Sequence, residues 1–410
     1  MKKILFILGM YYPKYSANGL CTKNVVDELI KNGYDVSCIC NGSKKSKKQE
    51  YVDGACLYYV KPRLHQILND KANDVSNDKK KYFLQRISIV LGKIQLGLMA
   101  FSWPLVSPMY AFNFYCRAKK LYQKERYDAV VAVYTPFESL LAGYWLKKKY
   151  PKIKFIPYYL DALAGGWGPS FFSQARIEKH TRKWEKKIDE AADLAISMHS
   201  SEHYHMLAAL CMKEKRIFLD VPVMKKPCDC DKEEPFALYA GNLNHKGRDI
   251  NKLLEIFSEL SSKTEIKLLL AGGCNDTKIF EYYEEKTHGK IQYLGILDHE
   301  DVLELEKKAK YLINLASINP YTIPSKIFEY MRFGKTIIST YQTEKDPSIE
   351  YLNKYNNVIY IDERLSVKES AEKLFKDMYV ERKTEVSELE KVFYYNTPKA
   401  FVDVVRTRLK

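Results

Sequence analysis

Short apolar runs alternate with longer helical patterns twice along this chain, and this alternation restricts the fold more than any other feature. Ile4–Leu8 is a compact apolar run typical of a buried parallel strand. A helical pattern at Thr22–Lys31 and a second apolar run at Val36–Cys40 follow it. Further strands are expected at Ala129–Val133, Lys154–Tyr158 and Leu194–Ser197. This strand–helix–strand order predicts a doubly wound α/β domain.

A break at Val221–Pro235 divides the chain, because this stretch holds three prolines and several charges and has the composition of a linker. The alternation then restarts. Strands are expected at Ala237–Tyr239, Lys267–Leu270, Ile291–Leu294, Tyr311–Leu315, 336–339 and 358–361. The pattern predicts two Rossmann-like domains, 1–221 and 236–397, joined by a hinge at 222–235. Two such domains place a ligand in the cleft between them, at the carboxyl ends of the strands.

Pro324–Gly334 in the second domain has the pattern of a loop that feeds a helix of about two turns. Ser325 is expected to cap this helix through its hydroxyl, and Gly334 suits its C-terminal stop. Free amides near Ser325–Ile327 favour a phosphate at the start of the helix. Glu329, about one turn later, could accept hydrogen bonds from sugar hydroxyls. A diphosphate beside a ribose is a nucleotide, so the segment predicts a nucleotide site; an ordinary capped helix is the alternative.

A basic loop follows the first strand of the second domain. It begins with Gly241-Asn242 and continues to Lys246-Gly247-Arg248. A positively charged side chain that binds phosphate is expected in the loop after this strand. Lys246 and Arg248 could neutralise the charge that grows on a departing nucleoside diphosphate. A solvated charged turn is the alternative interpretation.

The first domain contains two candidate site positions. An Asn18-Gly19 turn follows the first strand, and glycine there lets the backbone approach a phosphate or a sugar. Asp161 follows the strand at Phe155–Tyr159, where catalytic groups lie in parallel sheets. Its carboxylate could orient an acceptor hydroxyl or stabilise a developing oxocarbenium ion. A helix cap or a surface carboxylate is the alternative.

These residues, in this order, resemble the retaining glycosyltransferases of the GT-B fold, particularly glycosyltransferase family 4. The resemblance covers most of the chain and is most specific in 237–340. In that family a pair of glutamates lies before and within the helix; Glu329 matches the second, whereas Tyr321 stands in place of the first. Lys246-Gly247 matches the family's Lys-Gly, and Asn242 stands where the family has an arginine.

The resemblance implies an α/β GT-B fold, a nucleotide-sugar donor such as a UDP-sugar held mainly by the second domain, an acceptor held by the first domain, and retention at the anomeric centre. It also implies that a helix over 398–410 crosses back onto the first domain. The residues that it assigns to donor binding are Gly19, Gly241, Asn242, Gly295, Ile296, Tyr321, Ser325, Lys326, Ile327 and Glu329. The residues that it assigns to catalysis are Asp161, Lys246 and Arg248.

The resemblance implies neither a metal nor another cofactor. Asp229-Cys230-Asp231 has the form of a metal–diphosphate motif. It falls in the hinge rather than after a strand, so no metal site is expected there.

The charge of the chain is concentrated near its N-terminus. Residues 1–120 contain 20 Lys or Arg and 8 Asp or Glu, and so carry most of the net charge of +15. This excess favours an anionic membrane surface or a lipid diphosphate as partner, and no nucleic-acid motif accompanies it. The stretch about 79–120 combines Lys79-Lys80-Lys81 with many apolar residues and with Trp103, a candidate headgroup anchor. We interpret it as a membrane-associating segment; a pair of helices packed onto the sheet is the alternative.

Nine scattered cysteines indicate a reducing compartment, and no apolar run is long enough to span a bilayer. We therefore expect a cytoplasmic enzyme, peripherally attached to the inner face of the cell membrane, that transfers a sugar to a lipid-linked glycan in capsule, exopolysaccharide or O-antigen synthesis. Two alternatives stay open. One is a GT-B-shaped nucleotide-sugar epimerase. The other is a non-catalytic nucleotide-sugar-binding module, which Tyr321 and Asn242 favour.

Overall fold

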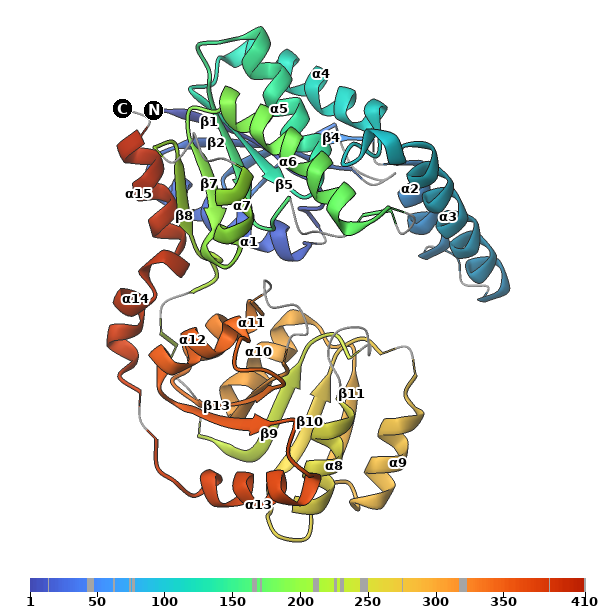
Figure 1. Cartoon of the computed structure of the whole chain (residues 1–410), viewed down its shortest axis with the longest axis vertical. Coiled ribbons are helices and arrows are strands. Elements are labelled where there is room, and N and C mark those ends of the chain that lie inside the picture. The colour runs from blue at the N-terminus through green and yellow to red at the C-terminus, as the bar shows by residue number, and fades with distance from the viewer. Residues whose placement is uncertain are drawn as a thin grey trace. The chain divides into compact units, whose positions relative to one another are not determined.

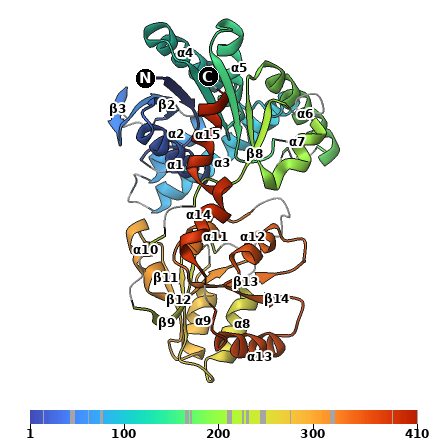
Figure 2. The same ribbon diagram turned by 90° about the vertical axis from the view of Figure 1, so that its left-hand side faces the viewer.

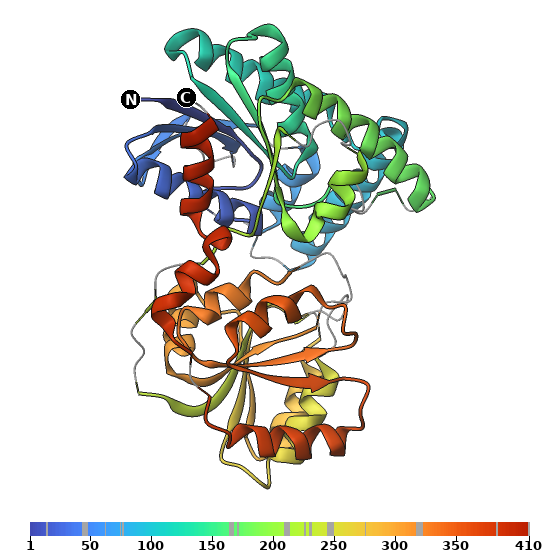
Figure 3. The ribbon, with the colours of Figure 1, turned by 60° about the vertical axis from the view of Figure 1, so that its left-hand side comes forward.

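The computed structural model divides the chain into two compact units. Unit 1 comprises Met1–Pro222 and Tyr395–Lys410, and unit 2 comprises Val223–Tyr394. Figure 1 shows the ribbon, and Figures 2 and 3 show it after rotation. The structure describes every residue except 14, 43–47, 62, 74, 76–77, 164–167, 170–171, 209–213, 225–226, 229–231, 244–249, 275, 317–322, 383 and 409–410.

Unit 1 is built on a sheet whose described strands follow the order β3-β4-β2-β1-β5-β6-β7-β8. The strands are β1 (Lys3–Ile7), β2 (Asp35–Asn41), β3 (Gln49–Val52), β4 (Ala55–Val60), β5 (Ala129–Tyr134), β6 (Lys154–Tyr159), β7 (Ala195–Met198) and β8 (Arg216–Leu219). β3 pairs antiparallel with β4, and the other described pairings are parallel. The carboxyl ends of the parallel strands therefore lie along one edge, where ligands bind in such folds.

Helices cover both faces of this sheet. They are α1 (Ala17–Lys31), α2 (Leu64–Asn73), α3 (Asp78–Leu98), η1 (Ala100–Ser102), α4 (Pro108–Glu125), α5 (Phe137–Lys149), α6 (Gln174–Ala191), η2 (His199–Ser201), α7 (Glu202–Ala208) and α15 (Pro398–Arg408). Phe114 of α4 and Leu140 of α5 pack with Val130 and Phe155 of the sheet in one buried cluster. α1 and α15 lie side by side (Figures 2 and 3). The ring centroid of Phe401 on α15 lies 4.9 Å from the ring centroid of Tyr158 and 6.4 Å from that of Phe6.

Unit 2 contains a sheet whose described strands follow the order β11-β10-β9-β12-β13-β14, with every described pairing parallel. The strands are β9 (Glu234–Ala240), β10 (Lys267–Ala271), β11 (Ile291–Gly295), β12 (Ala309–Asn314), β13 (Thr336–Tyr341) and β14 (Val358–Asp362). The helices are α8 (Asn251–Leu260), α9 (Lys278–Lys286), α10 (His299–Lys308), α11 (Lys326–Met331), α12 (Pro347–Tyr355), α13 (Val367–Met378), η3 (Val386–Glu388) and α14 (Leu389–Val392). η4 (Tyr394–Asn396) spans the second boundary between the units. Leu254 and Phe257 of α8 pack with Leu268, Leu270 and Leu374 to form the core.

The strands predicted from the alternation are confirmed, with ends that differ by a few residues. Among the strands, the alternation missed β3, β4 and β8. β3 is a short edge strand with exposed side chains, so it lacks the apolar run that identified the others. The predicted hinge overlaps unit 2, which begins at Val223, while β9 begins at Glu234.

Two local predictions in unit 1 were wrong. Asn18-Gly19 is not a turn but belongs to the first turn of α1, because Ser16 is the N-cap and its hydroxyl accepts from the Gly19 amide at 3.1 Å. Trp103 is only 6% exposed, so its ring is part of the packed structure and not a headgroup anchor.

Among the described residues, no helix combines the length and the apolar character needed to cross a bilayer.

Candidate functional site

Glycines line the carboxyl edge of the sheet in unit 2. The Gly241 amide donates to the carbonyl oxygen of Ala271 at 2.9 Å, and the Gly272 amide donates to that of Gly295 at 2.7 Å. Gly272 has a φ of +141°, and a Cβ there would lie 1.7 Å from the carbonyl oxygen of Gly241. Only glycine fits so close an approach of two backbones. Among the described residues, the ends of β9, β10 and β11 therefore form an edge with few side chains.

Ile296 follows this glycine edge and is 82% exposed. Gly273 lies beside it, since a Cβ on Gly273 would be 3.9 Å from Ile296 Cδ1. The carbonyl oxygen of Asn242 accepts from the hydroxyl of Tyr239 at 3.0 Å, which fixes the start of the loop after β9. An exposed apolar side chain next to bare backbone can receive the face of a planar ring.

An ion-pair triad lies on α10 and α11. Lys326 Nζ lies 2.9 Å from Glu306 Oε1 and 3.2 Å from Glu329 Oε2. The Glu306 side chain is 4% exposed, and burial raises its pKa against the opposing effect of the Lys326 ammonium. Burial alone would lower the pKa of the Lys326 ammonium. The nearby acidic groups have the larger combined effect, so its pKa is raised; they are Tyr330, Glu306 and Glu329. The triad holds the Glu329 carboxylate in one place.

The start of α11 differs from its prediction. Ser325 is the residue before the helix, but its φ of −59° and ψ of −25° are already helical, and its side chain makes no capping hydrogen bond among the described residues. A capping residue usually has an extended backbone, which lets its side-chain oxygen accept from an amide of the first turn. The helical conformation of Ser325 therefore explains the missing cap. The Ile327 amide donates to the carbonyl oxygen of Pro324 at 3.3 Å, so it is not free for a phosphate.

In unit 1, Asn18 joins the ends of three parallel strands. Its Nδ2 donates to Oδ2 of Asp161 at 2.8 Å, to the carbonyl oxygen of Tyr134 at 3.2 Å and to Oγ1 of Thr135 at 3.5 Å. Asn18 follows β1, Tyr134 ends β5, and Asp161 follows β6. Burial of the Tyr134 hydroxyl raises its pKa, and the nearby Asp161 carboxylate adds to the shift. An exposed carboxylate is thus held by an amide at the carboxyl edge of the sheet.

Gly19 is buried behind this contact. A Cβ there would lie 2.4 Å from the carbonyl oxygen of Met10, so glycine lets the loop after β1 pack against α1. Packing inside unit 1 therefore accounts for a glycine at position 19, and no contact with a ligand is needed to explain it.

Several predicted residues lie outside the described residues. They are Lys246, Gly247, Arg248, Tyr321 and the motif Asp229-Cys230-Asp231. Within the part of the chain that the structure describes, no group of three or more His, Cys, Asp or Glu is arranged to hold a metal ion. Sequence reasoning missed Asn18 as the partner of Asp161, and Glu306 as the partner of Lys326.

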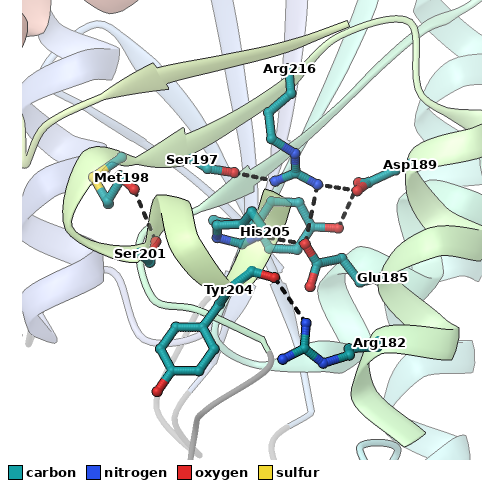
Figure 4. Close-up of polar contacts among 10 residues, drawn as sticks. Arg182, Glu185, Asp189, Ser197, Met198, Ser201, Tyr204, His205 and Arg216 are labelled. Atoms are coloured by element: carbon teal, nitrogen blue, oxygen red, sulfur yellow. Dashed lines mark hydrogen bonds and ion pairs between the residues drawn. The ribbon is translucent and has the colours of Figure 1, made fainter. Parts of the chain in front are cut away.

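A second polar cluster in unit 1 is fully buried (Figure 4). Arg216 of β8 pairs with Asp189 and, at 3.2 Å, with Glu185, both on α6. His205 Nδ1 meets Glu185, and the Tyr159 hydroxyl donates to Asp189 at 3.0 Å. Burial raises the pKa of Asp189 to about 7, while Arg216 opposes the shift. These contacts fasten α6 and α7 to the sheet.

No protein-family model and no curated protein sequence matches the chain. Solved structures match it along its length. A glycosyltransferase from Rickettsia africae ESF-5 has a TM-score of 0.62 at 14% identity, covering 100% of this chain and 99% of that one. The lipopolysaccharide outer core galactosyltransferase WaaB in its apo form has a TM-score of 0.56 at 15% identity, covering 99% of each chain.

The catalytic domain of starch synthase IV from Arabidopsis thaliana, bound to ADP and acarbose, has a TM-score of 0.59 at 10% identity, covering 100% of this chain and 99% of that one. At these identities the likeness concerns the fold. Two α/β units with parallel sheets match the structural neighbours, and the chain has the GT-B fold of glycosyltransferases.

Proposed function

We propose that the chain is a retaining glycosyltransferase that moves a sugar from a nucleotide-sugar donor, a UDP-sugar, to a lipid-linked glycan acceptor in the synthesis of a bacterial surface polysaccharide. Its fold is shared with a galactosyltransferase and with a starch synthase bound to ADP, which supports a nucleotide-sugar donor. The proposal needs no metal and no other cofactor, because Lys246 and Arg248 are assigned to the diphosphate charge.

In this proposal unit 2 binds the donor. The base packs against the exposed side chain of Ile296, and the backbone at Gly241, Gly272 and Gly295 lets the ligand come close. Glu329 accepts hydrogen bonds from the ribose hydroxyls. The Lys326 triad is the single observation that carries this assignment, because the ammonium of Lys326 fixes the position of the Glu329 carboxylate, whose oxygens can then accept hydrogen bonds.

Unit 1 binds the acceptor. During transfer the bond between the anomeric carbon and the diphosphate oxygen breaks, and the acceptor oxygen bonds to that carbon on the same face. The proton of the acceptor hydroxyl leaves with the diphosphate or passes to Asp161. Asn18 holds Asp161 in place by its 2.8 Å hydrogen bond, which suits either an acceptor-orienting or a charge-stabilising role.

We also propose that unit 1 rests on an anionic membrane surface. Phe83, Leu98, Phe101, Met109 and Phe112, on α3, η1 and α4, are each more than half exposed. Lys79, Lys80 and Lys81 lie at the start of α3. Exposed apolar side chains beside a basic cluster suit a surface of anionic lipid. These side chains take the anchoring role that the sequence had assigned to Trp103.

The test of the function is a transfer assay with the purified chain. A series of nucleotide-sugars is offered with lipid-linked glycan, and the labelled lipid product and the released nucleoside diphosphate are measured. Glu329→Ala is expected to lower kcat/KM for the donor. The control is Glu304→Ala on α10, whose carboxylate pairs with Lys307 at 2.6 Å and is not part of the triad.

The rival functions give different results in the same assay. Nucleotide binding with no turnover for any donor would identify a non-catalytic module. Conversion of the donor sugar to its epimer, with no transfer, would identify an epimerase.

A further inference from the structure

A pocket of about 450 Å³ in unit 1 is lined by residues of α2, α3 and α4 and of the segments beside them. One part of its lining is basic, with Lys61 and Arg63 from the connection between β4 and α2 and His65 from the first turn of α2. Another part is apolar, with Leu91, Ile94 and Leu98 from α3 and Met99 directly after it. The pocket therefore suits a molecule with an anionic end and a hydrocarbon end.

The basic lining is held in place by buried contacts. Arg63 Nη2 donates to Glu138 Oε2 at 2.6 Å, and the Ser107 amide donates to the other oxygen of this fully buried carboxylate at 2.8 Å. The Arg63 guanidinium lies 5.3 Å from the centre of the Tyr110 ring. Since Glu138 pairs with Arg63, Lys61 supplies the net positive charge of this lining.

Two hydrogen-bond donors at the pocket are unused. The Tyr110 hydroxyl and Arg63 Nε have no hydrogen-bond partner among the described residues. Tyr110 is 3% exposed, and it lines the pocket. Native proteins pair almost all buried donors, so these two groups suit an acceptor oxygen of a bound ligand. Both atoms are covered by neighbouring atoms, so a ligand oxygen reaches them when the side chains that line the pocket shift.

The apolar lining continues onto the protein surface. Ile94, Leu98 and Met109 line the pocket and are also more than half exposed. On α3, Ile94 and Leu98 continue a stripe that begins with Phe83 and Val90, because helical spacing places these four side chains on the same face. A hydrocarbon chain that leaves the pocket thus stays in contact with apolar side chains.

We propose that this pocket binds the phosphate-bearing end of the lipid carrier of the acceptor, an amphiphile with a phosphate or diphosphate group and a hydrocarbon tail. The inference rests on the proposed function and adds the place where the lipid is recognised. A phosphate oxygen accepts from the Tyr110 hydroxyl and Arg63 Nε, and Lys61 balances the charge. The tail leaves along Ile94 and Leu98. A free sugar phosphate would gain nothing from that apolar exit.

The position of the pocket in the sheet fits this assignment. Lys61 follows β4, and the strand order β4-β2-β1-β5-β6 places it on the same carboxyl edge as Asn18 and Asp161. Four strand spacings of about 4.8 Å separate β4 from β6, about 19 Å in all. The acceptor therefore has a short glycan between its phosphate and the hydroxyl that reacts near Asp161.

The test measures binding alone, by calorimetry of the whole chain with no nucleotide-sugar present. The probes are farnesyl diphosphate, inorganic diphosphate and farnesol. Farnesyl diphosphate is expected to bind at least about tenfold more tightly than either fragment, because it alone fills both parts of the pocket. Equal binding of inorganic diphosphate would show a site for free phosphate, and equal binding of farnesol would show a plain apolar groove; either result overturns the proposal.

Variants locate the binding. Lys61→Glu and Ile94→Asp are each expected to weaken farnesyl diphosphate binding about tenfold. The matched controls Lys93→Glu and Ile89→Asp change exposed residues of α3 that do not line the pocket, and they are expected to bind normally. Equal losses in the controls would place the ligand on the outer surface and refute the assignment.

Tyr110→Phe separates a ligand role from a structural role. It removes only a buried hydroxyl that has no partner among the described residues, so the melting temperature is expected to stay the same or rise. The affinity for farnesyl diphosphate is expected to fall. Unchanged affinity would refute the role of this hydroxyl. Because no donor is present in these titrations, they succeed or fail independently of the transfer assay.

Discussion

Asn18 and Asp161 lie far apart in the sequence, yet Nδ2 of Asn18 donates a 2.8 Å hydrogen bond to Oδ2 of Asp161. The contact joins the loop after β6 to the first turn of α1. Asn18 is held in turn by the carbonyl oxygen of Tyr134, at the end of β5. A single amide thus sets the position of an exposed carboxylate at the edge where the proposal places the acceptor.

Asn18→Ala is expected to lower kcat of transfer about tenfold, because Asp161 loses the hydrogen bond that orients it. The melting temperature should change little, since both side chains are at least partly exposed. The control is Asn24→Ala on the same helix, which removes a hydrogen bond to the carbonyl oxygen of Pro222 and does not touch Asp161. Equal kcat values for the two variants would contradict the positioning role of Asn18.

Glu329→Ala is expected to raise the Kd for UDP about tenfold, through the loss of a charged acceptor for the ribose hydroxyls. Equilibrium binding of UDP to the variant and to Glu304→Ala tests this directly. The Glu304 side chain is exposed and pairs with Lys307. Unchanged affinity in Glu329→Ala would remove Glu329 from the donor site.

Lys326→Met is expected to destabilise the fold by roughly 1–3 kcal/mol, because the buried Glu306 carboxylate loses its partner. Urea unfolding measures the change. Part of the loss should return at low pH. The pKa of Glu306 is already raised by burial, and without the ammonium it rises further, so protonation then removes the unpaired charge. A loss that does not depend on pH would contradict this account.

Gly272→Ala is expected to destabilise the chain strongly, since a Cβ there would lie 1.7 Å from the carbonyl oxygen of Gly241 and the φ of +141° is unfavourable for alanine. The matched control is Gly97→Ala on α3, where no atom lies within 4 Å of the added Cβ. That change is expected to stabilise the helix by up to about 1 kcal/mol. Thermal unfolding of the two variants should shift in opposite directions.

The buried cluster of Figure 4 predicts a pH dependence of stability. The pKa of Asp189 is raised by burial from 3.8 to about 7 in the folded chain, so the folded state binds more protons than the unfolded state between these values. The free energy of unfolding should therefore fall as pH rises from about 4 to about 7, by at most about 1.4 kcal/mol per pH unit from this group.

Urea unfolding at several pH values, compared with Asp189→Asn, isolates this contribution. Glu185, His205, Tyr159 and Arg216 surround Asp189 and stay in the variant. The slope with pH should flatten in Asp189→Asn, whatever the change in overall stability. An identical slope would assign the pH dependence to other groups.

The parallel strands could be predicted because their signal is local. Each buried strand, such as Val130–Val133 or Leu268–Leu270, is a run of apolar residues that needs no knowledge of its neighbours. The first turn of α1 was obscured by Asn18-Gly19, a pair typical of turns. Ser16, three residues before Gly19, is the local signal that could have corrected it.

The partners within the candidate site could not be predicted in the same way. Lys326 lies next to Glu306 because α10 and α11 pack in one unit, and their separation in the sequence carries no sign of the pairing. Asn18 reaches Asp161 because strand order brings β1 and β6 to either side of β5. Contacts of this kind depend on tertiary packing, which a local pattern does not encode.

Because α15 belongs to unit 1, the fold of unit 1 cannot be completed until the ribosome has made unit 2. Unit 2 is a continuous insertion between the two parts of unit 1, and the Asp220 amide donates to the carbonyl oxygen of Tyr395 at 3.0 Å where these parts meet. While the ribosome makes unit 2, at about 5–20 residues per second, α15 does not yet exist. Phe6 and Tyr158, which later pack with Phe401, stay uncovered during that time. The length of unit 2 therefore sets how long the nascent first unit presents an apolar face to chaperones.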